Sequence, residues 1–165
     1  MFEEIDVQEA IIKSLQTEKN AMNFYQLGAT KMKDPDAIRV FNVLAAEERE
    51  HAGHFYKIYK GSSIPDFDEF IDAPPDYEST WMVALSRTIN SDFTEQKALE
   101  LAMSKEQNLE KTLRETAAKI KDENVRAIFE MNARETHNHY EMIESEYARI
   151  MAMVHESDID TYVRE

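Results

Sequence analysis

Glutamate and histidine side chains recur in this sequence at a fixed separation, and both are residue types that bind metal ions. Glu106 follows Glu18 by 88 residues, and His139 follows His51 by the same 88 residues. Glu48 precedes His51 by three residues, so on a helix both side chains would project toward one region. Mixed carboxylate and imidazole ligation suits iron or manganese and also holds zinc. The pattern therefore predicts a site for two metal ions, to which the two halves of the chain contribute alike.

The 88-residue separation extends well beyond the proposed ligands, with no gap between the two halves. The matching pairs are Ala10/Ala98, Asn20/Asn108, Ala29/Ala117, Lys33/Lys121, Asp34/Asp122, Phe41/Phe129, Ala45/Ala133, Glu47/Glu135 and Tyr59/Tyr147. This constant separation indicates that the chain contains the same pair of helices twice. We therefore expect approximate twofold symmetry between residues 5–60 and 93–148.

Composition limits both the fold and the function. The 165 residues include only three glycines and four prolines, which favours an almost wholly helical single domain because helix interiors exclude both residue types. The net charge of −14 disfavours nucleic acid and anionic membranes as partners and favours metal cations. With no cysteine, iron–sulfur clusters and thiol nucleophiles are excluded. No basic leader or long apolar run is present, so we expect a soluble, cytoplasmic protein.

Apolar residues that step by threes and fours predict four bundle helices within the single domain 1–165. We expect them at about 5–33, 35–60, 94–121 and 123–153, with an acidic tail over 156–165. Residues 62–93 are rich in Pro, Ser and Asp and should form a long connection containing a short helix near 81–89. Such a length suits a crossover that runs along the bundle and brings the third helix parallel to the second.

The sequence resembles the ferritin-like di-iron carboxylate superfamily, and within it the bundle domain of rubrerythrin-like proteins. The resemblance covers residues 5 to about 153. It rests on Glu18 followed by Tyr25, on the run Ala46-Glu47-Glu48-Arg49-Glu50-His51-Ala52, and on Ser104-Lys105-Glu106. It implies an antiparallel four-helix bundle whose first and third helices each supply a Glu, while the second and fourth each supply a Glu-x-x-His motif. The implied cofactor is a pair of non-haem iron ions, with Glu18, Glu48, His51, Glu106 and His139 as metal ligands.

This sequence departs from the family pattern at three points. Thr136 stands where the fourth helix should carry a Glu that bridges the metals, and Leu109 stands where rubrerythrin proper has a further Glu. The cysteine-rich electron-transfer domain is also missing. Glu135 lies one residue, or about 100° of helix rotation, from Thr136 and is a candidate replacement ligand. Its alternative role is that of a flanking residue or a partner that supports a ligand. Glu110, one turn beyond Glu106, is a second candidate, with a rim carboxylate or salt bridge as its alternative role.

Tyr25 is expected to donate a hydrogen bond that orients a ligand carboxylate, although a simple packing role for this aromatic is the alternative. His54, His137 and His155 lie off the shared pattern and should occupy solvated positions. We expect outer aromatics to leave apolar surface that a twofold partner covers in a homodimer: Tyr56, Tyr59, Phe67, Phe70 and Trp81.

Three functions remain open at this stage. The first is di-iron redox chemistry on dioxygen or hydrogen peroxide, as a ferroxidase or a peroxidase-like enzyme that takes electrons from an external donor. The second is metal binding without redox chemistry, with a second site weakened by Thr136. The third is a structural helical module whose metal site has decayed.

Overall fold

The computed structural model describes the backbone of residues 5–163 and the side chains of residues 5–154. His155 therefore lies outside the described side chains. Every regular element in the described part of the chain is helical, as predicted. The six helices are α1 (Val7–Lys31), α2 (Pro35–Ile58), α3 (Phe67–Asp72), α4 (Thr80–Ser91), α5 (Glu95–Ala117) and α6 (Glu123–Val163).

The first hairpin, α1 and α2, begins and turns at residues with clear local roles. The Asp6 carboxylate accepts a hydrogen bond from the Glu9 amide and caps α1, and the Asp34 carboxylate caps α2 by accepting from the Ala37 amide. Pro35 occupies the first turn of α2, where its missing N–H costs nothing. Packing between the two helices is tight, because a Cβ placed on Gly28 would come within 2.7 Å of the Phe41 ring.

The second hairpin, α5 and α6, repeats this plan. The Thr94 hydroxyl caps α5 by accepting from the Lys97 amide, and Asp122 accepts from the amides of Asn124 and Val125 at the start of α6. Asp34 and Asp122 are paired by the sequence repeat. Both accept hydrogen bonds from backbone amides at the start of the second helix of their hairpin. The repeated turn in the sequence reflects a repeated structural unit.

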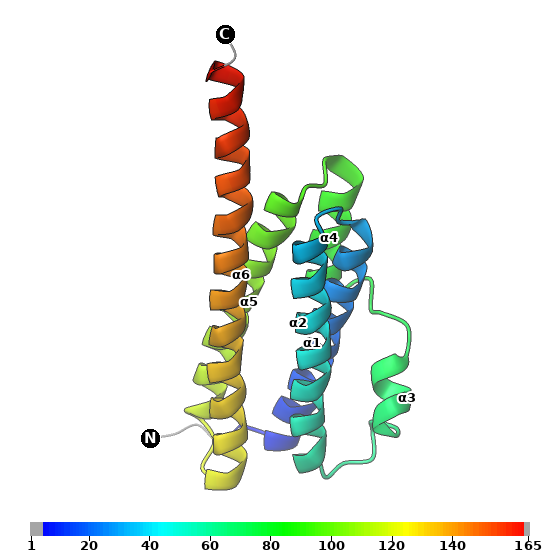
Figure 1. Ribbon diagram of the computed structural model, residues 1–165. Helices are drawn as coiled ribbons and strands as arrows, with labels where there is room; N and C mark the ends of the chain where they lie inside the picture. The colour runs from blue at the N-terminus through cyan, green and yellow to red at the C-terminus, as the bar shows by residue number, and fades with distance from the viewer. Residues whose placement is uncertain (1–4, 164–165) are drawn as a thin grey trace.

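The connection between the hairpins contains the predicted short helix, α4, and a further short helix, α3, that the sequence reading missed. A buried lysine holds the intervening loop in place: Lys19 Nζ donates to the carbonyl oxygen of Ala73 at 2.7 Å and to the Asn23 side chain at 2.9 Å. From that point α4 runs along the bundle and contacts both α1 and α5. Figure 1 shows that the chain enters α5 in the same direction as α2, as predicted.

Two sequence expectations about the surface need correction. Trp81 and Phe70 are buried, and Tyr56, Tyr59 and Phe67 pack against the core instead of forming an open apolar face, because the connection folds back over them. The segment expected to be an acidic tail is also a continuation of the last bundle helix. Helix α6 continues to Val163, since no glycine or proline follows residue 153 to stop it.

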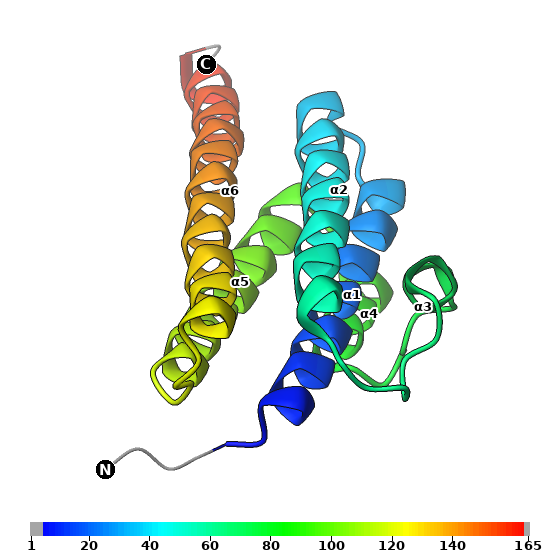
Figure 2. The same ribbon diagram turned by 90° about the horizontal axis from the view of Figure 1, so that it is seen from below.

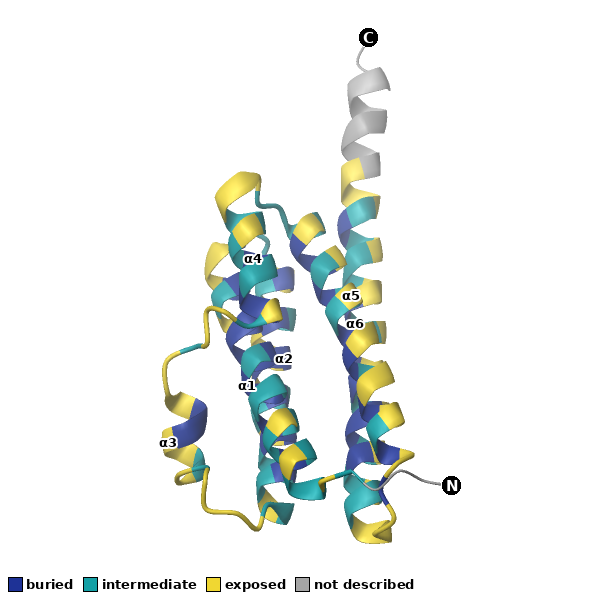
Figure 3. Cartoon of the chain, turned by 180° about the vertical axis from the view of Figure 1, so that it is seen from behind, coloured by how far each residue is buried: buried dark blue, intermediate teal, exposed yellow. Residues whose placement is uncertain are grey.

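The four long helices form the expected ferritin-like bundle, with buried residues facing inward and exposed residues outward (Figure 3). Figure 2 shows the two hairpins as separate pairs, with α2 beside α6 on one face of the bundle. Helices α1 and α5 carry the opposite face, on which α4 lies. Among the described residues, no helix has the length and apolar character needed to cross a membrane.

Candidate metal centre

The predicted ligand residues meet between the two hairpins at mid-height of the bundle. Glu18 comes from α1, Glu48 and His51 from α2, Glu106 from α5 and His139 from α6. The three carboxylates have no exposed surface, and each histidine is only 3% exposed. Three buried carboxylates in a helical core are costly unless something with positive charge compensates them. The sequence repeat therefore correctly predicted that these residues come together.

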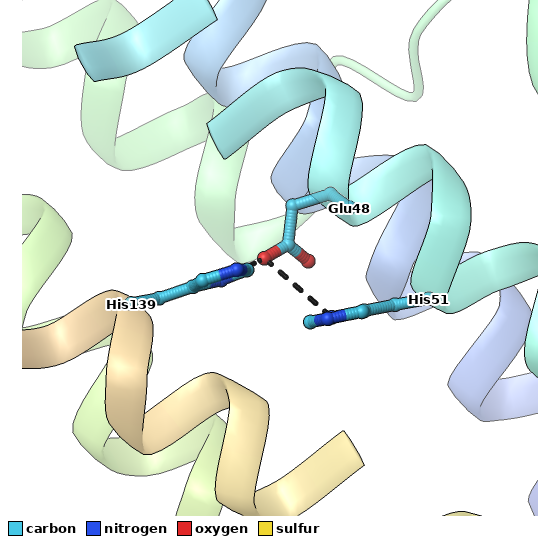
Figure 4. Close-up of side chains that lie close together, drawn as sticks. All are labelled: Glu48, His51 and His139. Carbon is cyan, nitrogen blue, oxygen red and sulfur yellow. Dashed lines mark ion pairs between the residues drawn. The ribbon is translucent and has the colours of Figure 1, made fainter. Parts of the chain in front are cut away.

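Glu48 lies between the two histidines (Figure 4). Its Oε1 atom is 2.7 Å from His139 Nδ1 and 3.9 Å from His51 Nδ1. The two imidazole rings stack with their centroids 4.9 Å apart and their planes 9° from parallel. Glu48, His51 and His139 each offer one ligand atom within 4.8 Å of the others, a spacing that suits a shared metal ion. A carboxylate in this position is able to bridge two ions.

Glu18 and Glu106 occupy equivalent positions on either side of Glu48. Glu18 Oε2 lies 3.7 Å from His51 Nδ1, and Glu106 Oε1 lies 3.7 Å from His139 Nδ1. Each half of the bundle thus offers one carboxylate and one imidazole nitrogen to the same interior space. The equality of the two distances is the structural counterpart of the 88-residue repeat.

Two outer carboxylates contact the histidines from the solvent side. Each of them contacts the histidine that belongs to the other hairpin. His51 Nε2 lies 2.7 Å from Glu135 Oε2 on α6, and His139 Nε2 lies 2.9 Å from Glu47 Oε2 on α2. A carboxylate at Nε2 favours the imidazole tautomer that keeps its proton there and leaves Nδ1 free to bind metal. Glu135, a candidate ligand from sequence, therefore lies behind His51 and away from Glu48. The sequence reading gave Glu47 no role, although the Glu47/Glu135 pair of the repeat pointed to it.

The charges of the centre strongly perturb its titration. Burial raises the pKa of Glu48 well above its usual range, and repulsion from Glu18 and Glu106 adds to that rise. Burial alone would lower the pKa of His139, but contacts with Glu106, Glu47 and Glu48 outweigh burial and raise it. Without metal, these shifts favour a proton on Glu48 and on His139.

The buried polar atoms of the centre make no hydrogen bond of good geometry, although Glu48 Oε1 and His139 Nδ1 lie only 2.7 Å apart. They are both carboxylate oxygens of Glu18 and of Glu48, Glu106 Oε2, Glu47 Oε2, and the Nδ1 atoms of His51 and His139. Buried polar atoms are nearly always paired, so a converging group of unpaired oxygen and nitrogen atoms indicates a bound cation. The set of hard oxygen and borderline nitrogen donors fits iron, manganese or zinc.

Comparison with known proteins agrees with this geometry. The family model named Rubrerythrin matches residues 9–147, which reach from the first turn of α1 into α6 and include every predicted ligand. The chain belongs to the rubrerythrin family. No match was found among curated proteins or among solved structures. The sequence contains no cysteine, so these residues include no rubredoxin-type domain.

Thr136 occupies the position at which the resemblance implies a bridging Glu. Its side chain is fully buried, and its hydroxyl donates to the Asn132 carbonyl oxygen one turn back in α6, at 2.7 Å. The hydroxyl is therefore engaged with its own helix. Leu109, at the other departure from the implied pattern, is also buried and adds an apolar side chain. Neither residue brings a negative charge to the part of the centre built by α5 and α6.

The remaining candidates lie outside the centre. Glu110 accepts hydrogen bonds or ion pairs from Arg114 at 2.8 Å and from His137 at 2.9 Å, so it is a rim carboxylate. His137 is exposed, as predicted. His54 is only partly exposed, and its Nδ1 atom lies 3.4 Å from the side-chain oxygen of the buried Asn132.

Tyr25 connects the centre to the aromatic core of the rubrerythrin bundle. Its buried hydroxyl donates to Glu106 Oε1 at 2.6 Å, which leaves Glu106 Oε2 free toward the centre. The Tyr25 ring meets the edges of Phe41 and Trp81, with centroids 4.9 and 6.3 Å away. Burial raises the pKa of Tyr25 well above its normal value, and the nearby Glu106 raises it further, so the phenol keeps its proton and acts as a donor.

A shallow pocket of about 220 Å³ opens from the centre onto the face formed by α2 and α6. Its walls include His51 and His139, and its rim carries Glu47, Glu50 and Glu135. Three carboxylates at the mouth attract cations and repel anions. This pocket is the route by which a metal ion would reach the two histidines.

Proposed function

We propose that this rubrerythrin-family chain holds two non-haem iron ions and uses them in redox chemistry on dioxygen or hydrogen peroxide, as a ferroxidase or a peroxide-reducing protein. The observation that carries the proposal is the set of unpaired oxygen and nitrogen atoms buried between the hairpins. Manganese or zinc would suit the same donors. A family match and a buried ligand cluster support metal binding directly, and the redox chemistry is our inference from them.

Each residue of the centre would have a distinct role. Glu18 and His51 would bind one ion, Glu106 and His139 the other, and Glu48 would bridge them. Bound iron would supply the capacity to pass electrons to an oxygen species. Because no cysteine is available for an electron-transfer cluster in these residues, electrons would have to come from an external donor.

The surrounding side chains would orient the imidazole and carboxylate groups of this centre. Glu47 and Glu135 would hold the two imidazoles with Nδ1 turned inward, across the boundary between hairpins. Tyr25 would fix the Glu106 carboxylate and hold a proton one hydrogen bond from the ligand. Burial of the whole group would limit water to the acidic mouth on the α2/α6 face.

Anaerobic titration of the metal-free protein with ferrous iron would test the proposal. We expect about two ions per chain at saturation, and a new near-ultraviolet absorption band when dioxygen or peroxide is then added. The matched control is a His51→Ala, His139→Ala variant, which should bind neither ion. Ferrous binding without any spectral or consumption change on adding either oxidant would contradict the redox part of the proposal.

A second function is favoured by Thr136 alone: binding of a single metal ion without redox chemistry. The hydroxyl of Thr136 is engaged by the Asn132 carbonyl, so the α5/α6 half has one anionic ligand fewer than the family pattern. Saturation at one zinc ion per chain, with no reaction toward dioxygen, would support this alternative. A protein whose thermal stability is indifferent to metal and to chelator would instead support a purely structural role.

We also propose that the chain forms a homodimer, although the aromatics that first suggested this are covered by its own connection. The exposed apolar side chains that remain include Met153 and Val154 on the long α6 and Val43 on α2. Such side chains on projecting helices are suited to a twofold contact. Sedimentation that finds only monomer at micromolar concentration would exclude this assembly.

A further inference from the structure

A second cavity in the described structure lies apart from the metal centre. It is a groove of about 480 Å³ between α1 and α5, on the opposite face of the bundle from the acidic mouth. On one side it is lined by α1 from Asp6 to Thr17, and on the other by α5 from Lys105 onward. Trp81, at the start of α4, closes one end.

The internal repeat explains why the groove exists. Twofold symmetry creates two equivalent positions on the α1/α5 face, and the single connection provides only one helix, α4, to fill them. Helix α4 packs where Trp81 meets the rings of Phe24 and Tyr25, near the second half of α1. The residues one repeat away from Phe24 and Tyr25 are Thr112 and Leu113, and these line the groove. The groove is therefore the unfilled counterpart of the position that α4 occupies.

The side chains of the groove have diverged from those beneath α4. Thr112 replaces Phe24, Ser14 replaces Ala102 and Lys13 replaces Leu101 at the positions related by the repeat. Each change exchanges an apolar side chain for a polar or cationic one. A second apolar helix would bury these groups without partners, which is unfavourable. The groove is suited instead to a smaller ligand with its own polar group.

The charges of the groove select an anion. Lys13, Lys105 and Lys119 all line it, and within the described residues none of their ammonium groups is within ion-pair distance of a carboxylate. Lys105 is partly buried, with part of its side chain inside the groove wall. Because α1 and α5 run antiparallel, the two carboxylates that line the groove, Asp6 and Glu9, share its end with Lys119, and Lys105 lies at the other end.

We propose that this groove binds a small amphipathic organic anion, with its acidic head at Lys105 and its apolar part against Trp81, Leu109 and Leu113. Those three apolar side chains are buried and form part of the groove wall. The Ser14 hydroxyl in the groove wall adds a hydrogen-bond donor, whereas the Thr17 hydroxyl already donates to the Lys13 carbonyl oxygen at 2.9 Å. A volume of 480 Å³ accommodates a molecule the size of a medium-chain carboxylate. The site uses no metal ligand, so it does not depend on the proposed redox function.

Fluorescence offers a direct test, because Trp81 is the only tryptophan of the chain and lies in the groove wall. Octanoate is added to the full-length protein in the presence of chelator, with octanol and octylammonium as comparison probes, and stoichiometry is measured by calorimetry. We expect one octanoate per chain, a saturable change in tryptophan emission, and binding at least about tenfold weaker for the other two probes.

Two substitutions and one control distinguish specific binding in the groove from non-specific binding to the protein surface. Lys105→Gln should weaken octanoate binding about tenfold, since it removes a charge-assisted contact. Ser14→Phe should abolish binding by filling the groove. Lys111→Gln, at an exposed lysine of α5 outside the groove, should change nothing. Equal binding of octanol and octanoate, or an unchanged affinity in Lys105→Gln by calorimetry, would overturn the proposal.

Discussion

Replacing Glu48 by glutamine should stabilise the metal-free protein while destroying much of its affinity for metal. Glu48 is fully buried, with Glu18 and Glu106 close enough to raise its pKa by repulsion in addition to burial. Glutamine has nearly the same shape and no charge. Because His139 would lose one of three carboxylate contacts but keep Glu47 and Glu106, no histidine is left without an acidic partner.

The size of the effect follows from the cost of buried charge. Replacing a buried ion pair by neutral side chains of similar volume is often neutral or stabilises a protein by about 1 to 4 kcal/mol, and here the charge removed is also repelled by Glu18 and Glu106. The lost contact with His139 offsets part of this, so we expect about 1 to 2 kcal/mol. For a chain of this length that corresponds to a rise in Tm of about 2 to 8 °C.

The pH dependence provides an independent check. An acid whose pKa is higher in the folded chain than in the unfolded chain destabilises the folded state once the pH exceeds its unfolded value, here near 4.5. The stability advantage of Glu48→Gln should therefore be small near pH 4 and grow as the pH rises toward neutrality.

Thermal denaturation followed by circular dichroism, in chelator and then in excess zinc, is the appropriate assay. In excess zinc the unmodified protein should have the higher Tm. Its zinc affinity is at least about tenfold greater than that of Glu48→Gln, so zinc binding stabilises it more. Glu115→Gln, an exposed change on α5 away from the centre, should alter neither measurement. A lower Tm for Glu48→Gln than for Glu115→Gln in chelator would refute the reasoning that this core is strained without metal.

Three further predictions concern the rest of the centre and the bundle. Thr136→Glu should restore a bridging carboxylate and tighten the weaker metal site about tenfold or more in a ferrous titration; an unchanged binding curve would mean that the α5/α6 half is already complete. Glu47→Gln and Glu135→Gln should each lower cobalt affinity about tenfold in competition with a chelator dye, with little change in metal-free stability. Asp34→Asn keeps the cap of α2 but loses the ion pair with Arg149, at a cost below about 1 kcal/mol at pH 7 in urea unfolding. Hydrogen bonding to the Ala37 amide and to Arg149 lowers the pKa of Asp34, so its contribution is present above about pH 4 and should vanish as the pH falls through the lowered folded value.

The ligand positions were predictable because two kinds of pattern coincide at them. Helical periodicity placed Glu18, Glu48 and His51 on inner faces, and the 88-residue separation placed Glu106 and His139 opposite. The same reasoning predicted the crossover and the direction of the third bundle helix. Local steps of three and four residues are well preserved in long, regular helices, so positions on their faces can be read without a structure.

The features that the sequence did not predict depend on contacts between segments distant in sequence. The crosswise contacts of Glu47 and Glu135 with the histidines require knowledge of how far the two hairpins are rotated against each other. Burial of Trp81 depends on the path of the connection, which Lys19 fixes through a loop more than 50 residues away. The continuation of α6 to Val163 was missed because a weakly apolar segment was taken for a tail, although it contained nothing to end a helix.

The internal repeat explains both the metal centre and the groove of this member of the rubrerythrin family. The metal centre lies where the symmetry holds, and the groove lies where it fails. Where symmetry holds, at the carboxylates and histidines, two equivalent half-sites converge on Glu48. It fails inside the centre at Thr136, whose counterpart is the bridging Glu48 itself, so the two half-sites share one bridging carboxylate where symmetry would give two. It fails again on the α1/α5 face, where a single α4 serves two equivalent positions and leaves the lysine-lined groove.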